Sequence, residues 1–249
     1  MTTSAFYAGG GRFERIVFAA GLLIVLGLAS ACGLAGSADS QGEVAQRGAG
    51  AALLTADDLP GWTQDTGGGG ADLDVQLSPA CDILKAQTAF AGASATAESP
   101  VFDGPDEQQV RSFSGVYASQ EAAARAISGI AAKVDGCRNE FKQALRAIAE
   151  RRLDAAGVSL GRLGNIDVSV EDGSPPARGQ DGRRYRIGVD VSVLGFHRQF
   201  RADFLLLREG QTAGALMYDR YGDLDEGEEA AITGRLDGRF QQADAIARQ

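Results

Sequence analysis

The chain has 249 residues, of which 44% are hydrophobic and 23% are charged, a composition typical of a globular protein with one sizeable core. Its 24 Lys and Arg against 33 Asp and Glu give a formal charge of -9, which disfavours a nucleic-acid partner because such partners are bound through their phosphates. One His and three Cys exclude zinc sites built from several His ligands and multi-cluster redox proteins.

The N-terminus has the pattern of an export signal. Two arginines precede an uncharged stretch, Ile16–Ala31, which ends in small residues directly before Cys32. This stretch of 16 residues is shorter than the roughly 20 apolar residues of a membrane-spanning helix. We therefore interpret residues 1–31 as a signal peptide, with an uncleaved membrane anchor as the weaker alternative.

The cleavage point, Leu28-Ala29-Ser30-Ala31-Cys32, resembles a bacterial lipobox, in which the Cys thiol is diacylated and the Cys becomes the new N-terminus. Ala29 stands where that motif usually has Leu. The alternative is an ordinary A-x-A cleavage site and a free secreted protein. Lipidation leaves the even pair Cys81 and Cys137, whereas ordinary secretion leaves an odd thiol in an oxidising compartment. We therefore predict lipidation of Cys32, with anchoring on the extracytoplasmic face of the cell membrane by two acyl chains.

Residues 32–52 are predicted to be the lipidated Cys and a flexible tether, because they are small, polar and aperiodic. Residues 53–249 are predicted to form a single extracytoplasmic domain. It begins with a short helical turn that Thr55 caps and that Pro60-Gly61 ends.

Alternating and helical spacing of apolar residues predicts the elements of this domain. The expected strands are Gln108–Tyr117, Ile166–Val170, Tyr185–Val193, Phe200–Leu206 and Thr212–Tyr218, and the expected helices are Ser119–Val134, a second one through Phe141–Leu153, and a last one that follows Asp225. Asp135-Gly136 is expected to separate the first two helices. Short loops between late strands predict an antiparallel meander, and the fold class is α+β in two layers, with the helices packed on one face of the sheet.

Cys81 and Cys137 are predicted to form a structural disulfide, with a free reactive thiol or intermolecular pairing as alternatives. His197 is the only base for a Ser-His-Asp or Cys-His site, and no nucleophile motif accompanies it, so we predict a surface or edge-strand residue. The acidic residues around Asp225 are interpreted as a helix cap and solvated charges rather than a calcium site. No catalytic residue, metal site or cofactor is predicted.

One local basic patch stands out on this acidic chain. It consists of four arginines in and after a loop rich in Pro and Gly: Arg178, Arg183, Arg184 and Arg186. They are predicted either to contact an anion or a lipid headgroup, or to lie on a solvated sheet face.

From Leu53 onward, the order of features resembles the extracytoplasmic sensor domains of actinobacterial serine/threonine kinases and related envelope lipoproteins. The matching features are the entry Leu53–Trp62, the two cysteines, the strand that ends at Tyr117 with its Ala-rich helix, and the late strands with the final helix. The resemblance implies a PsbP-like α+β fold with a groove and without catalysis. This chain departs from those sensors in having one expected disulfide where they typically have two, and in lacking a kinase domain.

The sequence thus predicts a membrane-anchored lipoprotein whose non-catalytic domain binds a small molecule, a lipid or an envelope protein. Two alternatives from other classes remain. One is an extracytoplasmic hydrolase, which a cleft with two facing carboxylates of perturbed pKa would support. The other is a structural envelope protein, which a contiguous exposed apolar patch would favour.

Overall fold

The computed structural model describes residues 38–65, 77–155, 164–193 and 196–248, which belong to one compact unit, Gly36–Gln249. The α-helices are α1 (Ala38–Ala51), α2 (Ala86–Ala89), α3 (Gln120–Ala155) and α4 (Glu226–Ala247). The strands are β1 (Thr63–Gln64), β2 (Ala95–Glu98), β3 (Phe102–Asp103), β4 (Gln109–Val116), β5 (Gly164–Gly173), β6 (Arg183–Val193), β7 (Phe196–Glu209) and β8 (Thr212–Tyr221). None of these described helices is long and apolar enough to cross a membrane.

The strands form one antiparallel sheet in the order β1-β3-β4-β8-β7-β6-β5. The late strands are joined in sequence, which confirms the predicted meander. β4 pairs with β8 over its whole length, so an early strand completes the sheet beside the last one. β2 and β3 share the other edge of β4, with Ala95 opposite Val116 and Phe102 opposite Val110. The predicted α+β class is confirmed.

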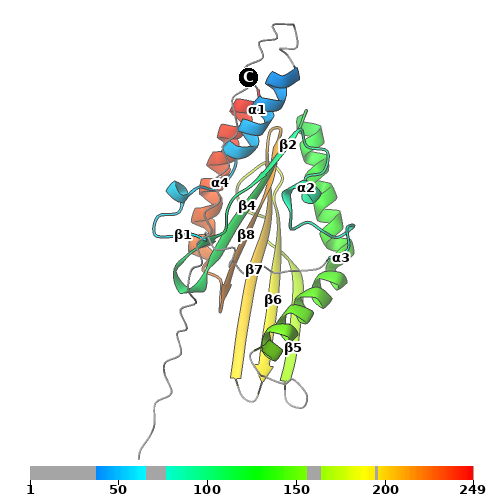
Figure 1. The fold of residues 1–249 in the computed structure, drawn as a ribbon, viewed down its shortest axis with the longest axis vertical. Helices are drawn as coiled ribbons and strands as arrows, with labels where there is room; N and C mark the ends of the chain where they lie inside the picture. The colour runs from blue at the N-terminus through cyan, green and yellow to red at the C-terminus, as the bar shows by residue number, and fades with distance from the viewer. Residues whose placement is uncertain (1–37, 66–76, 156–163, 194–195, 249) are drawn as a thin grey trace, which may run out of the picture. The chain divides into compact units, whose positions relative to one another are not determined.

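Helices cover both faces of this sheet, as Figure 1 shows with α3 on one side and α1 with α4 on the other. Successive side chains of a strand point to opposite faces. In β7, Phe204 and Leu206 pack in the cluster that includes the α3 side chains, whereas Leu205 and Leu207 pack in the cluster that includes α4. The expectation of helices on one face, in two layers, is therefore wrong. A central strand that is apolar on both faces, such as the Phe-Leu-Leu-Leu run of β7, is the signal for this arrangement.

α3 is a single helix of 36 residues, so the predicted break at Asp135-Gly136 is wrong. The buried stripe of the helix continues through this point, from Val134 to Phe141 and Leu145. Gly136 lies on the exposed side, where a glycine costs about 1 kcal/mol of helix propensity. Packing of the apolar stripe on the sheet outweighs that cost, and the two predicted helices become one.

The predicted flexible tether, residues 32–52, is wrong for its second half. Residues 32–37 lie outside the described residues, but Ala38–Ala51 is the helix α1, which packs on α4 and on β2. Its contact side is made of small residues, and a Cβ added at Gly48 would come within 3.3 Å of Val116 and 3.6 Å of the Ala243 carbonyl oxygen. A composition rich in Ala and Gly therefore serves close helix packing here rather than flexibility.

The first turn of the domain, at Thr55–Asp58, contacts α4. The prediction that Thr55 caps this turn is confirmed. Thr55 precedes a 3-10 turn, Ala56–Asp58, and donates from its backbone N and its Oγ1 to Asp58 Oδ2, at 2.8 and 2.9 Å. Arg239 of α4 donates to both carboxylate oxygens of Asp58. Burial opposes ionisation of Asp58, but these hydrogen bonds outweigh it and lower the pKa of the carboxyl.

The start of α4 shows why its acidic residues need no metal. Asp225 is the N-cap and accepts hydrogen bonds from the backbone N of Gly227 and Glu228, at 2.9 and 3.0 Å. The predicted capping role is confirmed for Asp225, whereas the expectation of solvated charges is wrong for Glu229, which is buried.

Candidate functional site

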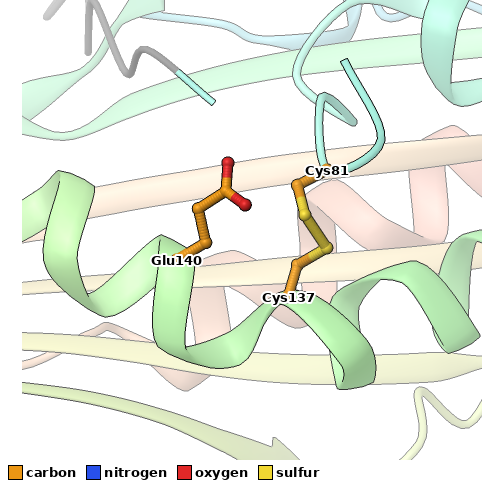
Figure 2. A group of neighbouring side chains, drawn as sticks. All are labelled: Cys81, Cys137 and Glu140. Carbon is orange, nitrogen blue, oxygen red and sulfur yellow. A yellow bond between two sulfur atoms is a disulfide. The ribbon is translucent and has the colours of Figure 1, made fainter. Parts of the chain in front are cut away.

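The predicted disulfide is confirmed: Cys81 and Cys137 are bonded, with 5.8 Å between their Cα atoms and 56 positions between them in sequence. Figure 2 shows the bridge between the Cys81 loop and α3, with Glu140 one helical turn further on. Ser78 donates to Glu140 from its backbone N and, at 3.0 Å, from its Oγ. The disulfide and these hydrogen bonds fasten the segment before α2 to α3.

Cys81, Cys137 and Glu140 are the only group of three or more Cys, His, Asp or Glu among the described residues with a spacing that suits a metal ion, since their ligand atoms lie within 4.8 Å of one another. A cysteine binds a metal as a thiolate. Both sulfurs are occupied by the disulfide bond, so in the oxidised protein the group is a clamp.

The structure does not gather the four predicted arginines on one basic surface. Arg184 and Arg186 point to the α4 face of the sheet, where they pair with carboxylates. Arg183 alternates with them and so points to the α3 face. Arg178 lies against Gly234 of α4, with its Cζ 3.5 Å from where a Cβ would be. The anions that Arg184 and Arg186 contact are therefore carboxylates of the protein itself.

The predicted lipidation site, Cys32, lies outside the described residues.

Those carboxylates form a buried charged cluster between β6, β7 and α4. Arg186 donates from Nε and Nη2 to the two oxygens of Asp203, both at 3.1 Å. Arg184 Nη2 lies 2.8 Å from Glu229 Oε1. The Asp203 and Glu229 side chains are 0% and 1% exposed. Burial, and then the charge of Asp203, raise the pKa of Glu229 to about 7.

Two facing carboxylates with a perturbed pKa are the feature that the hydrolase alternative requires. Asp203 and Glu229 lie next to each other and the pKa of Glu229 is raised, but neither carboxylate is accessible from solvent. A general acid or base must come within hydrogen-bond reach of its substrate. The pair is a structural element of the core rather than a candidate active site.

His197 has a serine and an aspartate beside it on β6. Its Nδ1 is 3.0 Å from Ser192 Oγ, and its Nε2 is 3.9 Å from Asp190 Oδ1, which is beyond a hydrogen bond. Asp190 accepts a hydrogen bond from Arg201 at 2.9 Å, and that bond is the main cause of its lowered pKa.

A Ser-His-Asp site needs the carboxylate to hold the imidazole. Here Arg201 holds Asp190 instead, and the His197 side chain is 54% exposed. The prediction of a surface residue is confirmed for His197.

A small apolar cavity of about 40 Å³ lies between α3 and the sheet. It is lined by side chains that include Ile83, Val134, Phe141 and Phe204. Small-molecule sites usually occupy about 300 to 1,000 Å³. The cavity is therefore a packing defect of the core and too small for a ligand.

A larger groove, of about 420 Å³, lies on the outer side of α3 and falls within that range. Its polar side chains are Tyr117, Arg125 and Lys133. The rest of its lining is small or apolar: Ala89, Ala91, Gly92, Ala122, Ala126, Gly129 and Ile130. Among the described residues, no carboxylate, serine or cysteine lines the groove, and its mixture of cations and apolar side chains is suited to binding.

Local sequence explains how these residues meet. Tyr117 follows β4 directly and donates its backbone N–H to the Gln211 carbonyl oxygen at 2.9 Å. Ser119 then caps α3, accepting from the backbone N of Ala122 at 3.2 Å. Arg125 and Lys133 are eight residues apart and so lie on one side of that helix, together with Gly129. Lys133 Nζ also donates to the Thr88 carbonyl oxygen at 3.4 Å, across the groove wall.

Sequence reasoning missed this site. The i, i+8 spacing of two cations on the outer side of a predicted helix was visible, but it is equally typical of a solvated helix face. What distinguishes the site is the wall contributed by Ala89–Gly92, and no pattern in the sequence predicts that this segment packs beside α3.

The comparison with solved structures gives a weak likeness. No protein family matches the sequence, and no curated protein matches it. Among solved structures, the chain is similar to the extracellular domain of PknH from Mycobacterium tuberculosis, with a TM-score of 0.33 and 11% sequence identity over 66% of this chain and 70% of that chain. A likeness of this size carries no argument, so the resemblance to the kinase sensor domains stays a prediction.

Proposed function

We propose that this protein is a membrane-anchored extracytoplasmic lipoprotein whose domain binds a ligand, without catalysis, in the groove beside α3. The groove is the observation that carries the binding function. It has the volume of a small-molecule site, and its described lining includes two cations and a tyrosine but no carboxylate, serine or cysteine.

Two features support the extracytoplasmic location. The uncharged stretch before Cys32 has the pattern of an export signal with a lipobox. The Cys81–Cys137 disulfide is of the kind that forms and persists in oxidising compartments.

A purely structural role through an exposed apolar surface has little support. Among the described residues, Tyr221 is the one large hydrophobic side chain that is exposed, at 39%. Single exposed residues of this kind are ordinary on a soluble surface and form no patch.

The anchoring part of the proposal is tested by mass spectrometry of the protein from its native membrane fraction, beside a Cys32→Ala variant. We expect a diacylglyceryl adduct on Cys32 and loss of the variant from the membrane fraction. An unmodified Cys32, or retention of residues 1–31, would overturn the lipoprotein assignment.

The binding part is tested by native mass spectrometry of the same full-length preparation, beside a Gly129→Leu variant. Nothing lies within 4 Å of a Cβ at Gly129, so leucine there extends into the groove without striking the protein. We expect a small-molecule adduct on the parent protein that the variant lacks. Equal adducts on both proteins would place the ligand outside the groove.

A further inference from the structure

We propose that the α3 groove takes an amphiphilic anion, a molecule with a carboxylate or phosphate head and a short apolar body. This inference rests on the proposed binding function and names its ligand class. It follows from three properties of the groove: its charge, a buried hydroxyl, and its apolar floor.

The charge of the groove is opposite to that of the whole chain. Both charged residues in the lining, Arg125 and Lys133, are cations, on a protein of formal charge -9. Among the described residues, neither of them forms an ion pair with a carboxylate. The pKa of Glu121, one turn before Arg125, is lowered mainly by a backbone hydrogen bond and by Ser119, with a smaller contribution from the Arg125 charge. Arginine and lysine bind carboxylates and phosphates through charge-assisted hydrogen bonds.

The Tyr117 hydroxyl provides an independent indication of a polar ligand. The Tyr117 side chain is 4% exposed and lines the groove, and its hydroxyl oxygen has no hydrogen-bond partner among the described residues. Burial raises the pKa of Tyr117 to about 12, so the hydroxyl keeps its proton and remains a donor. Most buried polar side-chain atoms have a hydrogen-bond partner. The hydroxyl oxygen has less than 1 Å² of exposed surface, so an anion in the groove becomes its acceptor only by displacing part of the wall that covers it.

The floor between the two cations is apolar and smooth. Arg125 and Lys133 are separated by two helical turns, about 12 Å along α3. Ala126, Gly129 and Ile130 line the groove on this stretch of the helix. A ligand there covers methyl groups while its head contacts a cation, which favours an amphiphile over a compact inorganic ion.

The test uses the full-length protein in phosphatidylcholine nanodiscs, with isothermal titration calorimetry and empty nanodiscs as the blank. The probes are hexyl phosphate, hexanoate, inorganic phosphate and neutral hexanol. We expect hexyl phosphate and hexanoate to bind, and both inorganic phosphate and hexanol to bind about tenfold more weakly or not at all. The two alkyl probes also distinguish a phosphate-headed ligand from a carboxylate-headed one.

Charge variants locate the binding. In Arg125→Gln with Lys133→Gln, the affinity for hexyl phosphate should fall about tenfold or more. The matched control is Lys142→Gln with Arg146→Gln, which makes the same change of charge on the same helix outside the groove. The control should bind as the parent does.

Tyr117→Phe separates binding from folding. It keeps the ring in the core and removes only the hydroxyl, so thermal stability should be unchanged or higher while affinity for the anionic probes falls about fivefold to tenfold. A loss of stability together with affinity would mean that the hydroxyl has a structural role, and would overturn its part in binding.

The outcomes separate this inference from the proposed function. If hexanol binds as tightly as hexyl phosphate and Gly129→Leu abolishes both, the groove is a ligand site but the anionic class is wrong. If the anionic probes bind the control and groove charge variants equally, the site assignment is wrong. If no probe binds at about 10 mM, a concentration that detects even millimolar affinities, both the ligand class and the proposed function fall.

Discussion

The two helical layers pack on the sheet in different ways. On the α4 side, α1, α4 and the sheet approach so closely that a Cβ at Gly214 of β8 would be 2.2 Å from Phe240 Cζ, and one at Gly48 would touch Val116. On the α3 side, a Cβ at Gly115 of β4 would also lie 2.8 Å from Phe90, but the helix borders both the small apolar cavity and the open groove.

The fastening of the two sides differs accordingly. Hydrogen bonds bind the α4 side to the rest of the domain: Ser114 Oγ donates to the Ala49 carbonyl oxygen at 2.7 Å, and Arg239 to Asp58 at 2.9 Å. On the α3 side, hydrogen bonds such as the one from Ser78 Oγ to Glu140 are joined by a disulfide, which holds the segment that contributes the groove wall. Close packing on the α4 side leaves no room for a ligand, whereas the disulfide on the α3 side holds the groove wall in place and leaves space beside it.

Removing the clamp should have the largest effect. The double variant Cys81→Ser with Cys137→Ser frees a loop of 56 residues, and we expect a loss of about 4 kcal/mol in the free energy of unfolding. Urea unfolding of the oxidised parent and the variant measures it. A loss below about 1 kcal/mol would show that the α3 side does not depend on the clamp.

Gly214→Ala should come next, because it tests the close packing of the α4 side. The added methyl would lie 2.2 Å from Phe240 and 2.6 Å from the Phe113 carbonyl oxygen, so backbone or α4 must move. We expect a destabilisation of about 3 kcal/mol, measured by the urea midpoint at constant slope. A neutral result would mean that α4 can shift freely on the sheet.

The buried charges of the α4 side should make stability depend on pH. Glu229 has an ordinary pKa of 4.5 and a folded-state pKa of about 7, raised mainly by burial. The folded protein holds this proton more tightly than the unfolded chain, so stability should fall as pH rises from about 4.5 to about 7, by about 3 kcal/mol, and level off above. Glu229→Gln should flatten that part of the curve. A curve of the same shape in the variant would assign the pH dependence to another group.

Gly129→Ala should have the smallest effect, and of opposite sign. The methyl enters open space on an exposed helix position, so helix propensity should raise stability by about 1 kcal/mol. Thermal unfolding beside Gly214→Ala gives the matched comparison between the two sides. Destabilisation by Gly129→Ala would contradict the open groove.

The sequence was a good guide wherever one local pattern decided the structure. The alternation in β6, the capping residues Thr55 and Asp225, and the even pair Cys81 and Cys137 each predicted a feature that the structure confirms. These features depend on side-chain period, local hydrogen bonding or the count of cysteines, all of which are present in the chain before it folds.

Tertiary packing decided the rest. It made α1 from a stretch that reads as a tether, because small residues allow close contact with Ala243 and Val116. It carried α3 past Gly136, and it placed helices on both faces of the sheet. It also formed the groove from Tyr117, Arg125 and Lys133 with a wall some thirty residues earlier in sequence. The sequence by itself determined the elements and their local caps, whereas burial of apolar surface between distant segments determined which elements meet, and a site made where they meet has no local signal.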